Sequence, residues 1–207
     1  IGDIAFVFIE VLLVTVIIHQ LLSNHEKKEK MEKMNMVIGA FYSEIGYNLL
    51  AYLSDNDENI DQIKEKFIFN DQNSHSYFKK MISLLSGYQE DLALTKQELA
   101  YLKIELSKYR DFLIRLLENP ILLEHELFTD LLWAVFHATE ELNYRKSLQN
   151  ITFNDLEHLN NDIKRVYKQL IIQWIHYLDY LKEHYPYLYS LALRVNPFDE
   201  KADPVLQ

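Results

Sequence analysis

The residue types best suited to chemistry are concentrated in EHELFTDLLWAVFHATEEL, residues 124–142. The polar members and one tryptophan recur at steps of four, three, four and four, in the order Glu126, Asp130, Trp133, His137 and Glu141. On a helix this spacing makes one ridge. Three interpretations are open: the ridge faces water, it lines the interior as metal ligands, or it presents Trp133 to a partner protein.

The metal interpretation can be made specific by comparison with carboxylate-bridged di-iron bundles. Those proteins use a Glu from each of two helices and a Glu-x-x-His pair from each of the other two. Here the candidate ligands are Glu44, His137, Glu141 and His176, which come from three expected helices. No Glu-x-x-His occurs, however, so the match is incomplete. Fe, Mn or Zn would be the metal, while the simpler expectation is that no cofactor binds.

Glu44 occupies an otherwise mostly apolar run, AFYSEIGYNLL, close to Phe41, Ile45, Asn48 and Leu49. This placement predicts that Glu44 points toward the bundle. An isolated carboxylate is poorly tolerated there, so we expect it to have a polar partner or a metal.

Other catalytic signatures are absent from the sequence. No phosphate-binding glycine loop, GxSxG, HExxH, CxxC or EF-hand loop occurs, and the chain has no cysteine. We therefore nominate no catalytic residue and no cofactor-binding residue. The function that this pattern favours is non-enzymatic and works through protein–protein contacts, as a scaffold, sensor or assembly subunit. The alternative is a metal-binding bundle with oxidoreductase activity.

The elements that must position these residues are helices. Only four glycines and four prolines in 207 residues leave few places for turns, and alternating β-branched segments are missing. Helical stripes and breaks predict an all-α chain of about four long helices in an antiparallel bundle. The first helix should run to about Leu53, and the later breaks should fall at 54–59, 119–120 and 145–152. A coiled-coil stalk is the alternative architecture, but clean heptads are not sustained.

The first twenty-two residues, IGDIAFVFIEVLLVTVIIHQLL, indicate a membrane-spanning helix, since about 20 apolar residues cross a bilayer. A buried core helix is the alternative. The expected division is an anchor at 1–22, a charged juxtamembrane helix at 23–33, a bundle at 34–198 and a solvated tail at 199–207. Lysines at 27, 28, 30 and 33 predict a single-pass cell-membrane protein with the N-terminus outside and the main domain cytoplasmic.

Partners follow from the same features. A carboxyl facing lipid is costly, so Glu10 should be protonated or paired at a helix–helix interface. We therefore expect a homo-oligomer or a complex with another membrane protein. The formal net charge of −10 argues against nucleic acid as a partner.

Two stretches resemble a group of bacterial and archaeal hypothetical proteins. They are the region from Glu10 to Leu53, with NMVIGAFYSEIG at 35–46, and the ending YPYLYSLALRVNPFD at 185–199. The resemblance implies a membrane anchor followed by a helical domain. It implies no activity and no site residues.

Overall fold

The computed structural model describes residues 2–122 and 125–205, with side chains from residue 12 onward. These residues are helical or irregular, and the extended pairing among them is an isolated bridge between Asp57 and Leu92. The expected all-α class is therefore confirmed for the described chain.

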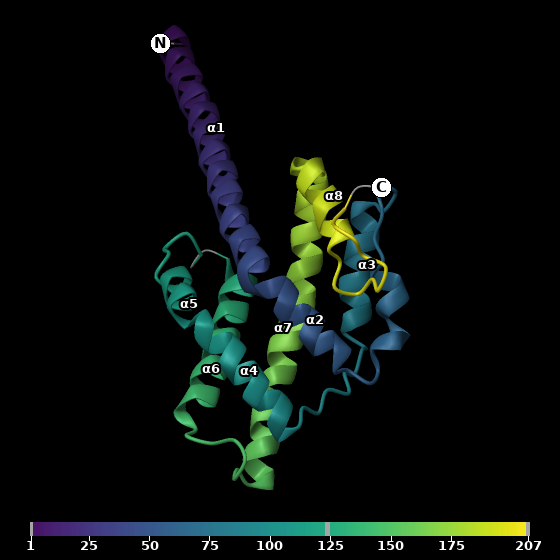
Figure 1. Cartoon of the computed structure of the whole chain (residues 1–207). Helices are drawn as coiled ribbons and strands as arrows, with labels where there is room; N and C mark the ends of the chain where they lie inside the picture. Colours follow the sequence, from purple (N-terminus) through teal and green to yellow (C-terminus); the bar gives the residue numbers. More distant parts are fainter. Residues whose placement is uncertain (1, 123–124, 206–207) are drawn as a thin grey trace.

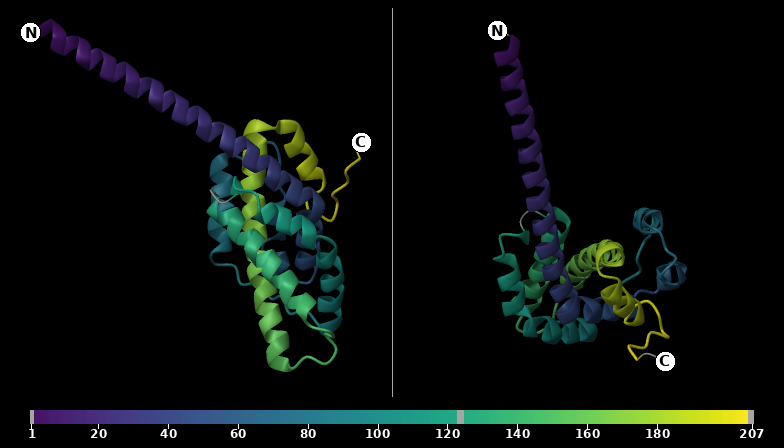
Figure 2. Two further views of the ribbon diagram at one scale, coloured as in Figure 1. Left: turned by 90° about the vertical axis from the view of Figure 1, so that its left-hand side faces the viewer. Right: turned by 90° about the horizontal axis from the view of Figure 1, so that it is seen from above.

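A long helical rod begins the chain. It consists of α1 (Gly2–Phe41), a π-helical turn η1 (Tyr42–Gly46) and α2 (Tyr47–Asp55). In Figures 1 and 2 the first part of α1 projects away from the body, and the rod joins the body only further along. From that point one stripe of side chains is buried, namely Met34, Ile38, Phe41, Ile45, Leu49 and Leu53. This is the stripe that the helical spacing predicts.

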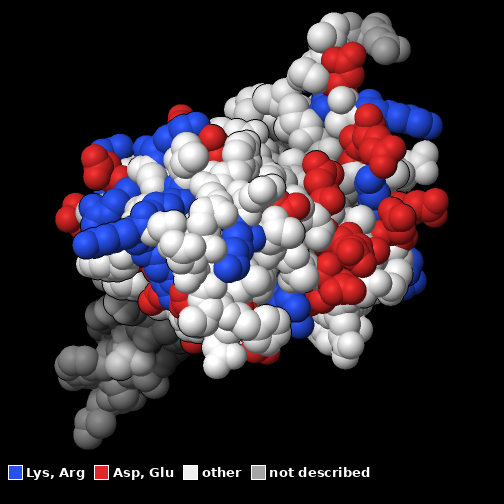
Figure 3. Space-filling view, turned by 60° about the horizontal axis from the view of Figure 1, so that its bottom comes forward, with Lys and Arg blue, Asp and Glu red and all other residues white. Residues whose placement is uncertain are grey.

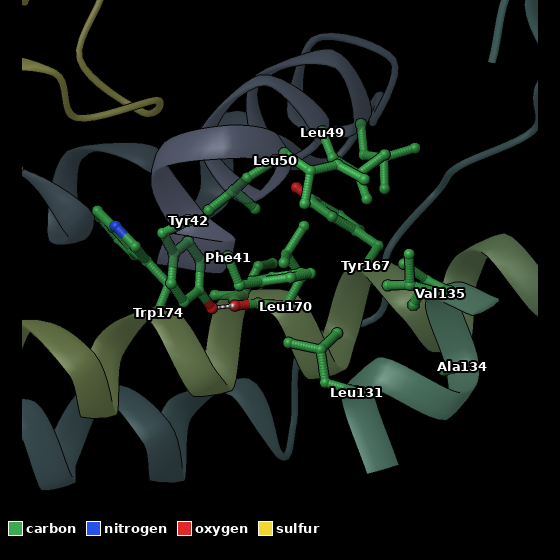
Figure 4. Packing of buried hydrophobic residues seen from close by; sticks show 14 of the residues in the cluster. Phe41, Tyr42, Leu49, Leu50, Leu131, Ala134, Val135, Tyr167, Leu170 and Trp174 are labelled. Carbon is green, nitrogen blue, oxygen red and sulfur yellow. Dashed lines mark hydrogen bonds between the residues drawn. The ribbon is translucent and has the colours of Figure 1, made fainter. Parts of the chain in front are cut away.

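The body is organised around α7 (Phe153–His184), which packs most extensively against α6 (Glu126–Tyr144). The two helices run antiparallel and are joined by the loop 145–152 (Figure 1). Figure 4 shows Phe41 and Tyr42 of the rod facing Leu170 of α7, with Leu131 of α6 beyond Leu170. The Tyr42 hydroxyl, fully buried there, donates a hydrogen bond of 2.9 Å to the Leu170 carbonyl.

Shorter helices cover the two sides of α7. On one side lie α4 (Lys96–Lys108), α5 (Arg110–Leu117) and α6; on the other lie η2 (Ile60–Gln62), η3 (Lys64–Phe67), α3 (His75–Leu85) and α8 (Pro186–Arg194) (Figures 1 and 2). A capping box forms at the start of α4. The Thr95 hydroxyl accepts from the Glu98 amide, and the Glu98 carboxylate accepts from the Thr95 amide.

The expectation of four long helices is wrong. The second predicted helix is split into α3, α4 and α5, because the extended segment 88–94 and the cap at Tyr109 interrupt it. Helix α6 begins at Glu126, six residues beyond the break at 119–120, and Thr152 caps α7.

The predicted membrane anchor also requires correction. Among the residues whose side chains are described, no helix is both long enough and apolar enough to cross a bilayer. The single-pass topology and the cell-membrane localisation are contradicted with it. Glu10, expected at an interface within the span, lies outside the described side chains.

Candidate functional site

The α6 ridge faces water along most of its length. Glu126, Asp130, Trp133 and His137 are exposed, and Glu141 is partly buried. The Trp133 ring is 54% exposed and makes an edge contact with Phe136. The ridge therefore does not line the interior of the bundle.

At the end nearest the loop 145–152, the ridge meets α7 in a cluster of charges centred on Asp162. The Asp162 side chain is only 6% exposed. Its Oδ2 atom lies 3.3 Å from His137 Nε2 and 3.6 Å from His158 Nε2, while its Oδ1 atom accepts from Arg165 at 2.7 Å. A buried carboxylate needs partners, and Arg165 supplies a hydrogen bond to Oδ1, whereas Oδ2 lies beside the two imidazole rings without a hydrogen bond from the described residues.

Arg145 closes the same cluster. Its guanidinium bonds both oxygens of Asp155 and, through another nitrogen, the Glu141 carboxylate at 2.7 Å. Arg145 follows the last residue of α6 and Asp155 lies in the first turn of α7, so the contacts join the two helices across their connection. The hydrogen bonds from Arg145 hold the pKa of both Glu141 and Asp155 below the usual range.

The four residues expected as metal ligands are not brought together. Glu44 is exposed on η1 and lacks the buried surroundings that we expected. His176 is fourteen residues beyond Asp162 on the same helix, about 21 Å away, and so cannot share a metal with His137. Glu141 is held by Arg145. In the described part of the chain no three His, Asp or Glu side chains are arranged to hold a metal, and the expected metal binding is corrected accordingly.

His176 belongs to a second group of titratable side chains, near the opposite end of α7. The protein surrounding the ring lowers the pKa of His176, and the neighbouring His125 adds to this effect. Asp179, which contacts His75 Nδ1, opposes it. His125 Nδ1 accepts a hydrogen bond of 3.1 Å from the Phe128 amide and so caps α6.

Sequence reasoning missed the α7 half of the Asp162 cluster. His158 and Asp162 are four residues apart and therefore share a face of α7, just as His137 and Glu141 share a face of α6. That matched spacing on two consecutive helices was the available signal. In the resulting arrangement Arg145 and Arg165 bond the carboxylates, and the contacts of Arg145 with Glu141 and Asp155 join α6 to α7.

The second candidate site is the projecting part of α1. Its large apolar side chains are between 51% and 66% exposed; they are Leu12, Leu13, Val14, Val16, Ile17, Ile18, Leu21 and Leu22. Apolar side chains occupy eight of these eleven consecutive helical positions and so lie on most sides of the helix, while Thr15, His19 and Gln20 are its polar members. It continues into exposed ion pairs between Lys28 and Glu32 and between Glu29 and Lys33. We call residues 12–22 the apolar arm.

Residues 30–194 match a family model described as the C-terminal helical domain of uncharacterized protein MJ1433. The chain belongs to this family. Uncharacterized protein MJ1433 of Methanocaldococcus jannaschii is 48% identical over 198 residues, which cover 96% of this chain and 79% of that protein. No solved structure matches the chain. The expectation of an uncharacterised family with archaeal members is thus confirmed for the MJ1433 domain, while the membrane anchor attached to that expectation is not shown.

Proposed function

We propose that this member of the MJ1433 family is an assembly protein that pairs with a second copy of itself through the apolar arm. The observation that carries the proposal is the exposure of eight large apolar side chains over most of the circumference of the arm. A helix that is apolar on most sides is normally covered. An isolated arm would leave a contiguous apolar surface in water, which is typical of interaction sites.

The free energy gained by burying the arms is similar in size to the cost of association, as expected for a reversible complex. Covering half of the exposed apolar surface of these eight side chains contributes roughly 6 kcal/mol per arm. Two arms together therefore supply roughly 12 kcal/mol, against an association cost of about 4–15 kcal/mol. Pairing should accordingly depend on protein concentration.

The charge pattern favours a parallel arrangement of the arms. In parallel register the apolar arm of one copy lies against that of the other. The segment 25–33, in which lysines and glutamates alternate, then lies beside itself and allows ion pairs between the helices. The bodies are not uniformly acidic either: Figure 3 shows basic side chains gathered on one side of a face and acidic ones on another. Two bodies can therefore meet with opposite charges facing.

The first experiment measures the mass of the full chain by light scattering over a hundredfold range of concentration. The double substitution Leu13→Lys and Ile17→Lys should convert a dimer or larger assembly into a monomer. The matched control, Asn24→Lys with His25→Lys, makes the same charge change on the same helix outside the arm. A chain that is monomeric at all concentrations, or two variants that behave alike, would contradict the proposal.

The orientation can be tested because the chain has no cysteine. Asn24→Cys introduces a single thiol just beyond the arm. Parallel arms in register bring the two thiols of a dimer together, so oxidation should link the copies covalently. An assembly that keeps its mass but gives no disulfide would show that the arms do not pair in parallel.

A further inference from the structure

A cavity of about 260 Å³ opens between the rod and α4, away from both the Asp162 cluster and the apolar arm. Its floor consists of buried aliphatic side chains, each 5% exposed or less: Ile45 and Leu49 from the rod, and Leu102 and Leu106 from α4. This floor offers apolar contact to an occupant, while Asn48 and the tyrosine hydroxyls add polar groups to the lining.

The walls of the cavity are aromatic. Tyr52, Tyr101 and Tyr109 line it, and the rings of Tyr52 and Tyr101 lie with centroids 5.0 Å apart at an angle of 37°. The Tyr52 hydroxyl donates to the Glu98 carbonyl at 3.0 Å, which fixes that ring. Tyr101 is half exposed and stands at the edge of the cavity. Two tilted rings next to an apolar floor suit a planar aromatic guest, since aromatic pairs favour offset and edge contacts.

The two helices on either side of the cavity, α4 and α2, pack against different neighbours, and this leaves space between them. Helix α4 packs mainly on α6, whereas α2 packs on α7 and on the π-helical turn. The turn ends at Gly46, where a side chain has no room, since a Cβ atom there would lie 2.5 Å from Tyr42 Cδ1. Ile45, within the turn, supplies part of the floor. π-Helical turns of this kind occur frequently at functional sites.

The charge of the lining and the volume of the cavity indicate which class of ligand fits. The charged side chain in the lining is Glu105, whose carboxylate lies 2.6 Å from the Lys108 ammonium, so the described lining carries no unpaired charge. This favours a neutral ligand over an organic cation. An apolar cavity of about 150 Å³ accommodates benzene. The larger cavity here fits a two-ring system. We propose that the cavity binds a neutral, planar, two-ring aromatic group of the size of indole.

Such a group can arrive as a free molecule or as a tryptophan side chain of another polypeptide. Titration calorimetry of the full chain with indole and with N-acetyl-tryptophanamide distinguishes these sources. We expect indole to bind. Binding of the amide as well would identify the ring of a polypeptide, and binding of indole alone would identify a free molecule. Failure of both probes, or tighter binding of tetramethylammonium than of indole, would overturn the proposal.

Substitutions connect the binding to this cavity. Tyr101→Ala removes a wall and should weaken indole binding by about tenfold, whereas Tyr101→Phe keeps the ring and should leave it unchanged. Ala51→Phe should fill the space and abolish binding. Tyr144→Ala, which removes an exposed tyrosine outside the cavity, is the matched control. Thermal unfolding checks that each variant folds. Folded Tyr101→Ala and Ala51→Phe variants that bind indole as the parent does would exclude the cavity as the site.

Discussion

The hydroxyl of Tyr177 occupies the space that a side chain at position 39 would need. A Cβ atom built on Gly39 lies 2.6 Å from Tyr177 Oη and 3.4 Å from its Cζ. Tyr177 is buried, and its ring stacks on Tyr42 with centroids 5.5 Å apart and planes within 6°. Glycine at position 39 thus allows α7 to approach the rod where α1 joins the body.

Gly39→Ala should therefore destabilise the fold although alanine is the better helix former. Overpacking costs about 1–3 kcal/mol, and the propensity gain returns at most about 1 kcal/mol. We expect a net loss of roughly 1–2 kcal/mol in urea unfolding. In a Tyr177→Phe background the closest atom is gone, so the same Gly39→Ala change should be neutral or stabilising. If Gly39→Ala changes the free energy of unfolding equally in both backgrounds, the Tyr177 hydroxyl is not what excludes a side chain at position 39.

The contacts of Arg145 predict a stability role for the α6–α7 connection. Arg145→Ala leaves Glu141 and Asp155 without their shared partner and should lower the free energy of unfolding by about 1–3 kcal/mol. Arg145→Lys keeps the charge but cannot bond two carboxylates in the same planar geometry, so it should recover only part of the loss. Chemical denaturation of the three proteins at neutral pH measures this order. A lysine variant as stable as the parent would show that charge alone suffices.

Because Glu44 is exposed, we expect its removal to have little effect on stability, although its apolar neighbours in sequence had predicted a buried and partnered side chain. Glu44→Ala removes a side chain at the surface and should change the free energy of unfolding by no more than about 0.5 kcal/mol. Phe41→Ala, three residues earlier on the same rod, empties a fully buried position and should cost about 3–5 kcal/mol. Urea unfolding of both variants makes the comparison. A loss near 2 kcal/mol for Glu44→Ala would indicate a partner for the carboxylate.

The failure at Glu44 shows what periodicity can and cannot provide. The stripe from Met34 to Leu53 was predictable because its spacing recurs over five turns, so single deviations average out. The direction in which one polar side chain points depends on the local number of residues per helical turn. In the π-helical turn the spacing departs from 3.6 residues, and Glu44 lies within it. The partners of Asp162 depend on how two helices align across a loop, which no single-helix pattern specifies.

Protonation of two histidines near the end of α7 should make stability depend on pH. His125 Nδ1 accepts from the Phe128 amide, and a protonated imidazole has no free lone pair for that bond. Burial lowers the pKa of His125, and the partial loss of hydration at the more exposed His176 lowers the pKa of that ring as well. Both groups bind protons less readily in the folded chain than in the unfolded chain, where the ordinary value is about 6.5.

The free energy of unfolding should consequently be highest above pH 7.5 and fall as the pH decreases through 6.5. Below that value the unfolded chain binds the additional protons, and each histidine contributes a slope of at most about 1.4 kcal/mol per pH unit. His125→Asn preserves a capping side chain but cannot titrate, so its stability should change less between pH 7.5 and 5.5 than that of the parent. His25→Asn, at an exposed position on α1, is the control and should keep the parental slope. Urea unfolding at several pH values tests this, and an unchanged slope in His125→Asn would exclude the capping histidine as the origin.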